Sequence, residues 1–102
     1  MNAEQYLYKA EFLLKRKEYE KLVEALEKAI LLANEHGDFV TLIKAHCFFG
    51  EFLFMQGEYA KAKEYLLFIL ENNDKTETCD DLLNEEIFQS DLLISLIERY
   101  KE

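Results

Sequence analysis

A duplicated segment limits what this chain can fold into more than any other feature of its sequence. Residues 10–21 read AEFLLKRKEYEK and residues 50–61 read GEFLFMQGEYAK, so related residues recur 40 positions apart. The identical pairs are Glu11/Glu51, Phe12/Phe52, Leu13/Leu53, Glu18/Glu58, Tyr19/Tyr59 and Lys21/Lys61. Self-similarity at a fixed spacing of this length is typical of stacked repeats, each of which is one supersecondary unit. The chain is therefore expected to contain two related units.

Periodicity and capping residues predict that the first unit is a pair of helices. The chain has no proline and only three glycines, which favours long uninterrupted helices. Asn2 followed by Gln5 matches a capping box for a first helix that ends near Lys15. After a turn at residues 16–17, a second helix carries apolar residues at helical spacing as far as Gly37, which is suited to end it.

The second unit repeats this pattern. Asp38 is placed to cap a third helix that continues to a turn at Gly57, and a fourth helix starts near Glu58. Tyr59, like its counterpart Tyr19, is expected to point inward from the start of its helix.

A fifth helix is predicted at the C-terminal end. Residues 72–77 form the clearest loop, and Thr78 with Asp81 three positions later matches a capping box for a helix over about 79–100. The apolar residues of this helix occupy more than one stripe, so a neighbouring surface must cover part of them. That surface is the groove of the same chain, a second copy or another partner. The candidate interface residues are Phe88, Leu92, Leu93, Leu96 and Tyr100.

The second unit resembles a tetratricopeptide repeat. The residues that carry the resemblance are the pair Phe49-Gly50, then Leu53, Gly57, Tyr59 and Ala62. The first unit is a degenerate match, with Ala10, Lys17 and Leu22 at the positions of Gly50, Gly57 and Ala62. The 40-residue spacing exceeds the usual repeat of about 34 residues, which makes the chain similar to the long-helix variety of kinesin light chains and peptide-responsive bacterial regulators.

The resemblance implies an all-α fold, an α–α superhelix of antiparallel helix pairs with five helices. One domain is expected, with repeat 1 over about 3–36, repeat 2 over about 38–72 and the C-terminal helix over about 79–100. The periodicity predicts the same helices independently, but the superhelical stacking comes from the resemblance.

The resemblance also implies a groove lined by the first helix of each pair. The lining residues would be Glu4, Leu7, Tyr8, Glu11 and Leu14, with Lys44, Cys47, Phe48, Glu51 and Phe54. Repeats that bind chaperone C-terminal carboxylates carry a Lys and Asn residues where this chain has Leu7, Tyr8, Cys47 and Phe48, so that ligand is not expected. An alternative stays open, in which these aromatic side chains are core residues or are covered by the fifth helix.

Charge argues against nucleic acid and membrane surfaces as partners. The net charge is −9, and residues 71–102 account for −7 of it, with 10 acidic and 3 basic side chains. The one basic run is Lys15-Arg16-Lys17, which is too short for a phosphate-binding surface.

Catalytic and metal sites are not expected. His36 and His46 lie on different predicted helices without further ligands at short spacing, so no metal or other cofactor is predicted. His46 and Cys47 are adjacent on one helix and point to different faces, which disfavours a nucleophile pair. A packed or partly exposed His46 is the simpler interpretation.

The sequence therefore favours a non-catalytic scaffold or adaptor in the cytoplasm that binds a peptide or helical segment of a partner protein. Cys47 and Cys79 fit free thiols in a reducing compartment better than a disulfide framework, and the first residues lack the features of a signal peptide. The alternative function is a structural subunit that self-associates through its C-terminal helix, which would make the chain a homo-oligomer.

Overall fold

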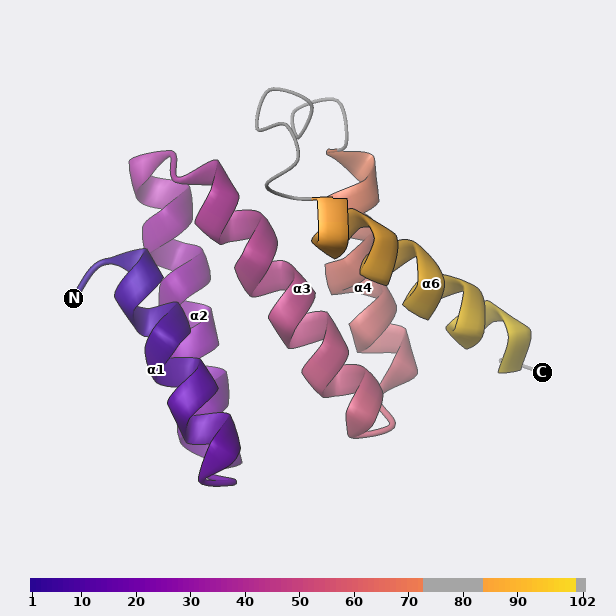
Figure 1. The fold of residues 1–102 in the computed structure, drawn as a ribbon, viewed down its shortest axis with the longest axis horizontal. Coiled ribbons are helices and arrows are strands. Elements are labelled where there is room, and N and C mark those ends of the chain that lie inside the picture. The colour runs from indigo at the N-terminus through magenta and orange to yellow at the C-terminus, as the bar shows by residue number, and fades with distance from the viewer. Residues whose placement is uncertain (73–83, 101–102) are drawn as a thin grey trace. The chain divides into compact units, whose positions relative to one another are not determined.

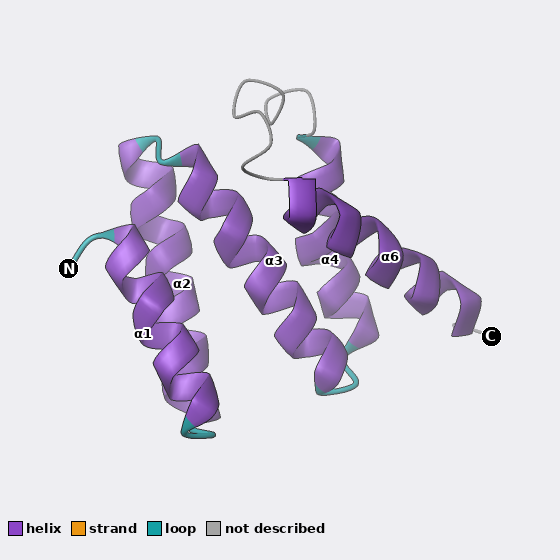
Figure 2. Cartoon of the chain, viewed as in Figure 1, coloured by secondary structure: helices purple, strands orange, loops and turns teal. Residues whose placement is uncertain are grey.

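The computed structural model describes residues 1–72 and 84–100, with the side chains of Asn84 and Tyr100 outside this described part. These residues form helices and connecting turns without strands, which confirms the predicted all-α class (Figures 1 and 2). The helices of the described residues are α1 (Ala3–Lys15), α2 (Tyr19–His36), α3 (Phe39–Met55), α4 (Tyr59–Glu71) and α6 (Asn84–Tyr100).

The chain divides into two compact units, Met1–Ala45 and His46–Glu102, with the boundary inside α3. In the first unit α1 packs against α2, and in the second α4 packs against α6. The residues of the predicted Thr78 capping box and the expected start of the last helix at Cys79 lie outside the described part.

The N-terminus of α1 is fixed by the predicted capping box. The Asn2 side chain accepts a hydrogen bond from the Gln5 backbone N–H at 2.9 Å, and the Gln5 side chain accepts one from the Asn2 N–H at 2.8 Å. Two otherwise unpaired backbone donors are satisfied reciprocally, which stabilises the first turn of the helix.

The turns that join α1 to α2 and α3 to α4 have the same backbone geometry. The Glu18 N–H donates to the Leu13 carbonyl at 3.0 Å, and the Glu58 N–H donates to the Leu53 carbonyl at 2.9 Å. Glu18 has φ −91° and ψ 73°, and Glu58 has φ −90° and ψ 70°. The sequence repeat is therefore also a repeat of backbone structure.

One residue in each turn is left-handed, with φ 59° at Lys17 and φ 81° at Gly57. Glycine adopts this conformation without steric cost, whereas a side chain at the same angles is strained. The first unit thus keeps the turn of the second without the residue that suits it best.

The junction between α2 and α3 follows the predicted signals. Gly37 is left-handed at φ 67° and donates to the Ala33 carbonyl. Asp38 then accepts a hydrogen bond at its side chain from the Thr41 N–H at 3.2 Å, which caps the start of α3.

Helices α3 and α4 approach each other closely at Gly50 in the second unit. A Cβ at this position would lie 2.6 Å from both Cγ and Cδ2 of Leu66, which is itself fully buried. The aligned Ala10 of α1 is also fully buried, so both units place a small residue where their helices pack.

Tyr19 and Tyr59 differ from the sequence-based expectation, because both are exposed. Each is the first residue of its helix, where the side chain lies at the edge of the helix pair. Tyr59 packs edge-on against the Phe54 ring, with the ring centroids 5.3 Å apart, instead of filling the interior.

Candidate functional site

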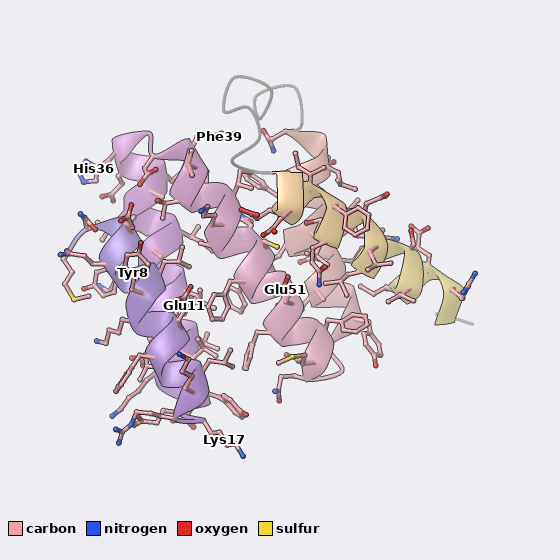
Figure 3. The ribbon with its side chains drawn as sticks, in the orientation of Figure 1. Tyr8, Glu11, Lys17, His36, Phe39 and Glu51 are labelled. Atoms are coloured by element: carbon pink, nitrogen blue, oxygen red, sulfur yellow. The ribbon has the colours of Figure 1, made fainter. Side chains whose placement is uncertain are left out.

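The predicted groove residues lie on α1 and α3, and the structure places them in very different environments. On α1, Glu4, Tyr8 and Glu11 are exposed, Leu14 is half-buried and Leu7 is buried. Figure 3 labels Tyr8 and Glu11 on this helix. Leu7 therefore belongs to the contact between α1 and α2 and is not on an open surface.

Tyr8 and Phe12 form an exposed aromatic pair on α1, with 59% and 58% of their surfaces accessible. They are one turn apart, and on a helix of 3.6 residues per turn they lie on the side opposite Ala3 and Ala10, which are buried. The α1 face, defined here as Glu4, Gln5, Tyr8, Lys9, Glu11, Phe12, Lys15 and Arg16, is exposed at every position.

Phe12 is the residue of this face that the groove prediction missed. Its counterpart Phe52 is 6% exposed, so equal positions of the repeat have opposite environments. The helical wheel of α1 contained the signal, because Phe12 lies opposite Ala10.

Basic side chains border the aromatic pair. The Arg16 guanidinium lies 5.5 Å from the centroid of the Phe12 ring, and its Nε donates to Glu18 at 2.9 Å. Glu18 also accepts from Lys21 at 3.2 Å, and the hydrogen bonds from Lys21 and Arg16 lower the pKa of the Glu18 carboxyl. The rim of the α1 face therefore carries both signs of charge.

The α3 residues of the predicted groove are less accessible. Lys44 is exposed, Phe48, Glu51 and Phe54 are half-buried, and Cys47 is buried. The Cys47 thiol donates to a Glu51 carboxylate oxygen at 3.6 Å.

Helix α6 contributes to the same cluster in the second unit. The Ser90 hydroxyl donates to the Glu86 backbone carbonyl at 2.7 Å, and the charge of Glu86 acts on both Cys47 and Glu51. Cys47 is therefore a buried residue whose neighbours include Glu51 and residues of α6, whereas Glu51 stays half-buried.

Burial raises the pKa of the Cys47 thiol far above its ordinary value, and the neighbouring Glu51 carboxylate raises it further. Burial also raises the pKa of Glu51, an effect that the hydrogen bond from Cys47 opposes and the charge of Glu86 increases. A thiol with a raised pKa is protonated at neutral pH and is a poor nucleophile.

His46 is buried in an aromatic stack between α3 and α4. Its ring lies 4.0 Å from the Phe68 ring at an angle of 11°, and 5.6 Å from the Tyr65 ring. A shallow hollow of about 250 Å³ is lined by these three residues and Glu64. The position of His46 agrees with the packed state expected from the sequence. Within residues 1–72 and 84–100, no group of three or more His, Cys, Asp or Glu side chains is arranged to hold a metal ion.

The candidate interface residues of α6 divide between the surface and the interior. Phe88 and Leu92 are 70% and 44% exposed, Leu96 is half-buried and Leu93 is buried. The Tyr100 side chain lies outside the described part. Sequence pattern alone did not separate Leu92 from Leu93, because both are large aliphatic residues of one apolar band.

Comparison of the chain with protein-family models, with curated proteins and with solved structures gives no match. No helix in the described ranges combines the length and the apolar character that crossing a membrane requires. Functional inference therefore depends on the geometry of the two units.

Proposed function

We propose that this chain is a non-catalytic protein–protein interaction module, a tetratricopeptide-like scaffold or adaptor that binds a segment of another polypeptide through the α1 face. The observation that carries the proposal is the aromatic pair Tyr8 and Phe12. Each side chain is more than half exposed on a helix whose opposite side is packed against α2. Exposed apolar patches with a polar rim are typical of protein-binding surfaces.

The residue types of the α1 face suit binding. Tyrosine and arginine are enriched among the residues that dominate binding energy at interfaces. Tyr8 and Phe12 supply two adjacent anchors, and Arg16 already stacks on Phe12. Glu4 and Glu11 on one side, with Lys9 and Arg16 on the other, select a partner segment that carries both signs of charge.

Site-specific photo-crosslinking in the native host tests this proposal. A photoreactive phenylalanine analogue replaces Tyr8 in one variant and Leu31 in a matched control, because Leu31 is a similarly exposed apolar residue on α2, with 52% of its surface accessible. Position 8 should crosslink to a defined protein that position 31 does not capture. Equal capture by both positions, or capture by neither, would contradict the use of the α1 face.

Self-association through α6 is the second candidate function, and the exposure of Phe88 and Leu92 favours it. The double variant Phe88→Glu with Leu92→Glu should then convert an oligomer into a folded monomer in sedimentation velocity. Equal association of the wild-type chain and the double variant would exclude this candidate.

A further inference from the structure

The α1 face has the residue spacing of a coiled-coil seam. Gln5, Tyr8, Phe12 and Lys15 follow one another at intervals of three, four and three residues, which are the alternating a and d positions of a heptad. All four are exposed, and the buried Ala3 and Ala10 lie diametrically opposite them. A second helix can therefore approach this seam without displacing α2.

Charged residues flank the seam in a defined order. Glu4 and Glu11 occupy the g positions on one side, and Lys9 and Arg16 occupy the e positions on the other. In a parallel coiled coil, a g residue of one helix lies beside the e residue five positions later in its partner. Two parallel copies of α1 would bring Glu4 beside the second copy's Lys9, and Glu11 beside its Arg16, and the two-fold symmetry would form each pair twice.

The opposite orientation is disfavoured by the same charges. In an antiparallel pair the equivalent flanks meet, so Glu11 would lie beside the second copy's Glu11, and Lys9 beside its Lys9. Like charges in contact oppose association. The exposed pair on α6 also lacks this self-complementarity, because the acidic Glu85 and Asp91 are exposed beside Phe88 and Leu92.

We propose that the α1 face binds a second copy of itself, with the two α1 helices parallel and in register. This inference rests on the proposed function, since it takes the α1 face as a protein-binding surface. Tyr8 and Phe12 form two central layers, each against the same residue of the second copy. A polar residue at a single a position, here Gln5, favours a defined register and a two-stranded coiled coil. The oxygen of Gln5 accepts from the Asn2 N–H, and its NH₂ group is the donor available to the second copy.

The pairing is expected to be weak. Only two of the four seam residues are apolar, and Lys15 faces the same residue of the second copy, although its flexible stem lets the ammonium group turn toward water. Small interfaces of this kind are typical of transient complexes, so the dissociation constant should be on the order of 0.1 mM. Salt should weaken the association, because the flanking pairs are exposed.

Charge reversal followed by mixing tests the register. One variant carries Glu4→Lys with Glu11→Lys, and the other carries Lys9→Glu with Arg16→Glu. Each alone should raise the dissociation constant about tenfold in sedimentation equilibrium, because four favourable pairs become repulsive. The two variants mixed in equal amounts should form a heterodimer at least as stable as the wild-type dimer. Circular dichroism checks that both are folded, and the single changes Glu4→Lys and Lys9→Glu replace them if Arg16→Glu disturbs the turn.

A disulfide tests the orientation. In a Cys79→Ser background, Tyr8→Cys should form an oxidised dimer readily, because a parallel pair places position 8 beside position 8. A matched control, Leu31→Cys, replaces a similarly exposed residue that lies on α2, away from the seam, and should not form this dimer. Efficient crosslinking only between Tyr8→Cys and Phe12→Cys chains would indicate an antiparallel pair and overturn the proposal.

The outcomes separate this inference from the proposed function. A chain that stays monomeric at millimolar concentration, yet captures another protein through position 8, overturns self-pairing alone. A dimer that responds to the α1 charges, while position 8 captures no other protein, overturns the proposed function alone. Association that is lost with Phe88→Glu and Leu92→Glu but is insensitive to the α1 charges also overturns self-pairing.

Discussion

Substitution of Gly50 measures how tightly the helices of the second unit pack. A methyl group added by Gly50→Ala would lie 2.6 Å from Cγ and Cδ2 of Leu66 and 3.5 Å from the Ala62 carbonyl oxygen. Leu66 is fully buried, so its side chain has no solvent space into which it can rotate. The contact must therefore be relieved by a shift of α3 relative to α4.

Two opposing terms set the magnitude. Alanine is better than glycine in a helix by about 1 kcal/mol, whereas overpacking of a close contact costs about 1–3 kcal/mol. Gly50→Ala should therefore lower the free energy of unfolding by about 0–2 kcal/mol. Gly50→Leu should lower it further, because three more carbon atoms enter the same space without a further gain in helix propensity.

A double-mutant cycle isolates the contact. Leu66→Ala alone should cost about 2–5 kcal/mol, because it leaves a cavity at a fully buried position. In the Gly50→Ala/Leu66→Ala variant the new methyl group occupies part of that cavity. The stability loss of the double variant should therefore be smaller than the sum of the two single losses by about 1–2 kcal/mol.

Urea unfolding monitored by helical circular dichroism provides the assay. Ser95, an exposed residue in the middle of α6, supplies the control, because Ser95→Ala compared with Ser95→Gly gives the propensity difference without a packing contact. The close approach would be refuted if Gly50→Ala stabilised the protein by the full difference measured at Ser95 and if the changes in unfolding free energy in the cycle were additive.

Three further substitutions test separate features. Lys17→Gly removes the backbone strain of a non-glycine residue at φ 59° and should raise the free energy of unfolding by up to about 1 kcal/mol. This value already subtracts the greater freedom of glycine in the unfolded chain. An unfolding titration that shows a loss of stability would contradict this. The pKa of Glu51 is raised in the folded protein, so its contribution to stability is present below the unfolded pKa and is lost as pH rises through the folded pKa. Glu51→Gln should therefore stabilise the protein more at pH 7 than at pH 4, and an equal effect at both values would count against the burial of this carboxyl. Leu93→Glu should cost about 3 kcal/mol or more because the side chain is buried, whereas the exposed Leu92→Glu should change stability by less than about 0.5 kcal/mol; similar losses in thermal unfolding would show that the two residues share one environment.

Features governed by local chemistry were predicted correctly from the sequence. The Asn2–Gln5 capping box, the left-handed Gly37 and the Asp38 cap each depend on residues within one turn of the chain. The helices they delimit agree with the observed bounds for the same reason. The 40-residue repeat added to this by aligning the turn at residues 16–17 with the turn at Gly57, and the structure shows that the two turns share one backbone hydrogen-bond pattern.

Features governed by tertiary packing were predicted less well. Phe12 and Phe52 are identical in the repeat, yet one is exposed and the other buried, so alignment within the chain did not give their environments. Cys47 was expected to line the groove, but its side chain is buried, and Glu86 and Ser90 of α6 lie close enough to affect its pKa. Helix α6 has no counterpart in the repeat, so alignment within the chain did not predict these neighbours. On α6 itself, Leu93 is buried and Leu92 is exposed. The periodicity of a broad apolar band could not distinguish these two adjacent residues.

The most direct test of the central claim is the affinity of the protein captured at position 8 for variants of the α1 face. Isothermal titration calorimetry should compare the wild type with Tyr8→Ala/Phe12→Ala and with Leu31→Ala, which removes a similarly exposed apolar side chain from α2. If the aromatic pair is the anchor, the double variant should bind at least about tenfold more weakly, while Leu31→Ala binds like the wild type. Equal affinities for all three chains would contradict the assignment of the α1 face as the binding surface.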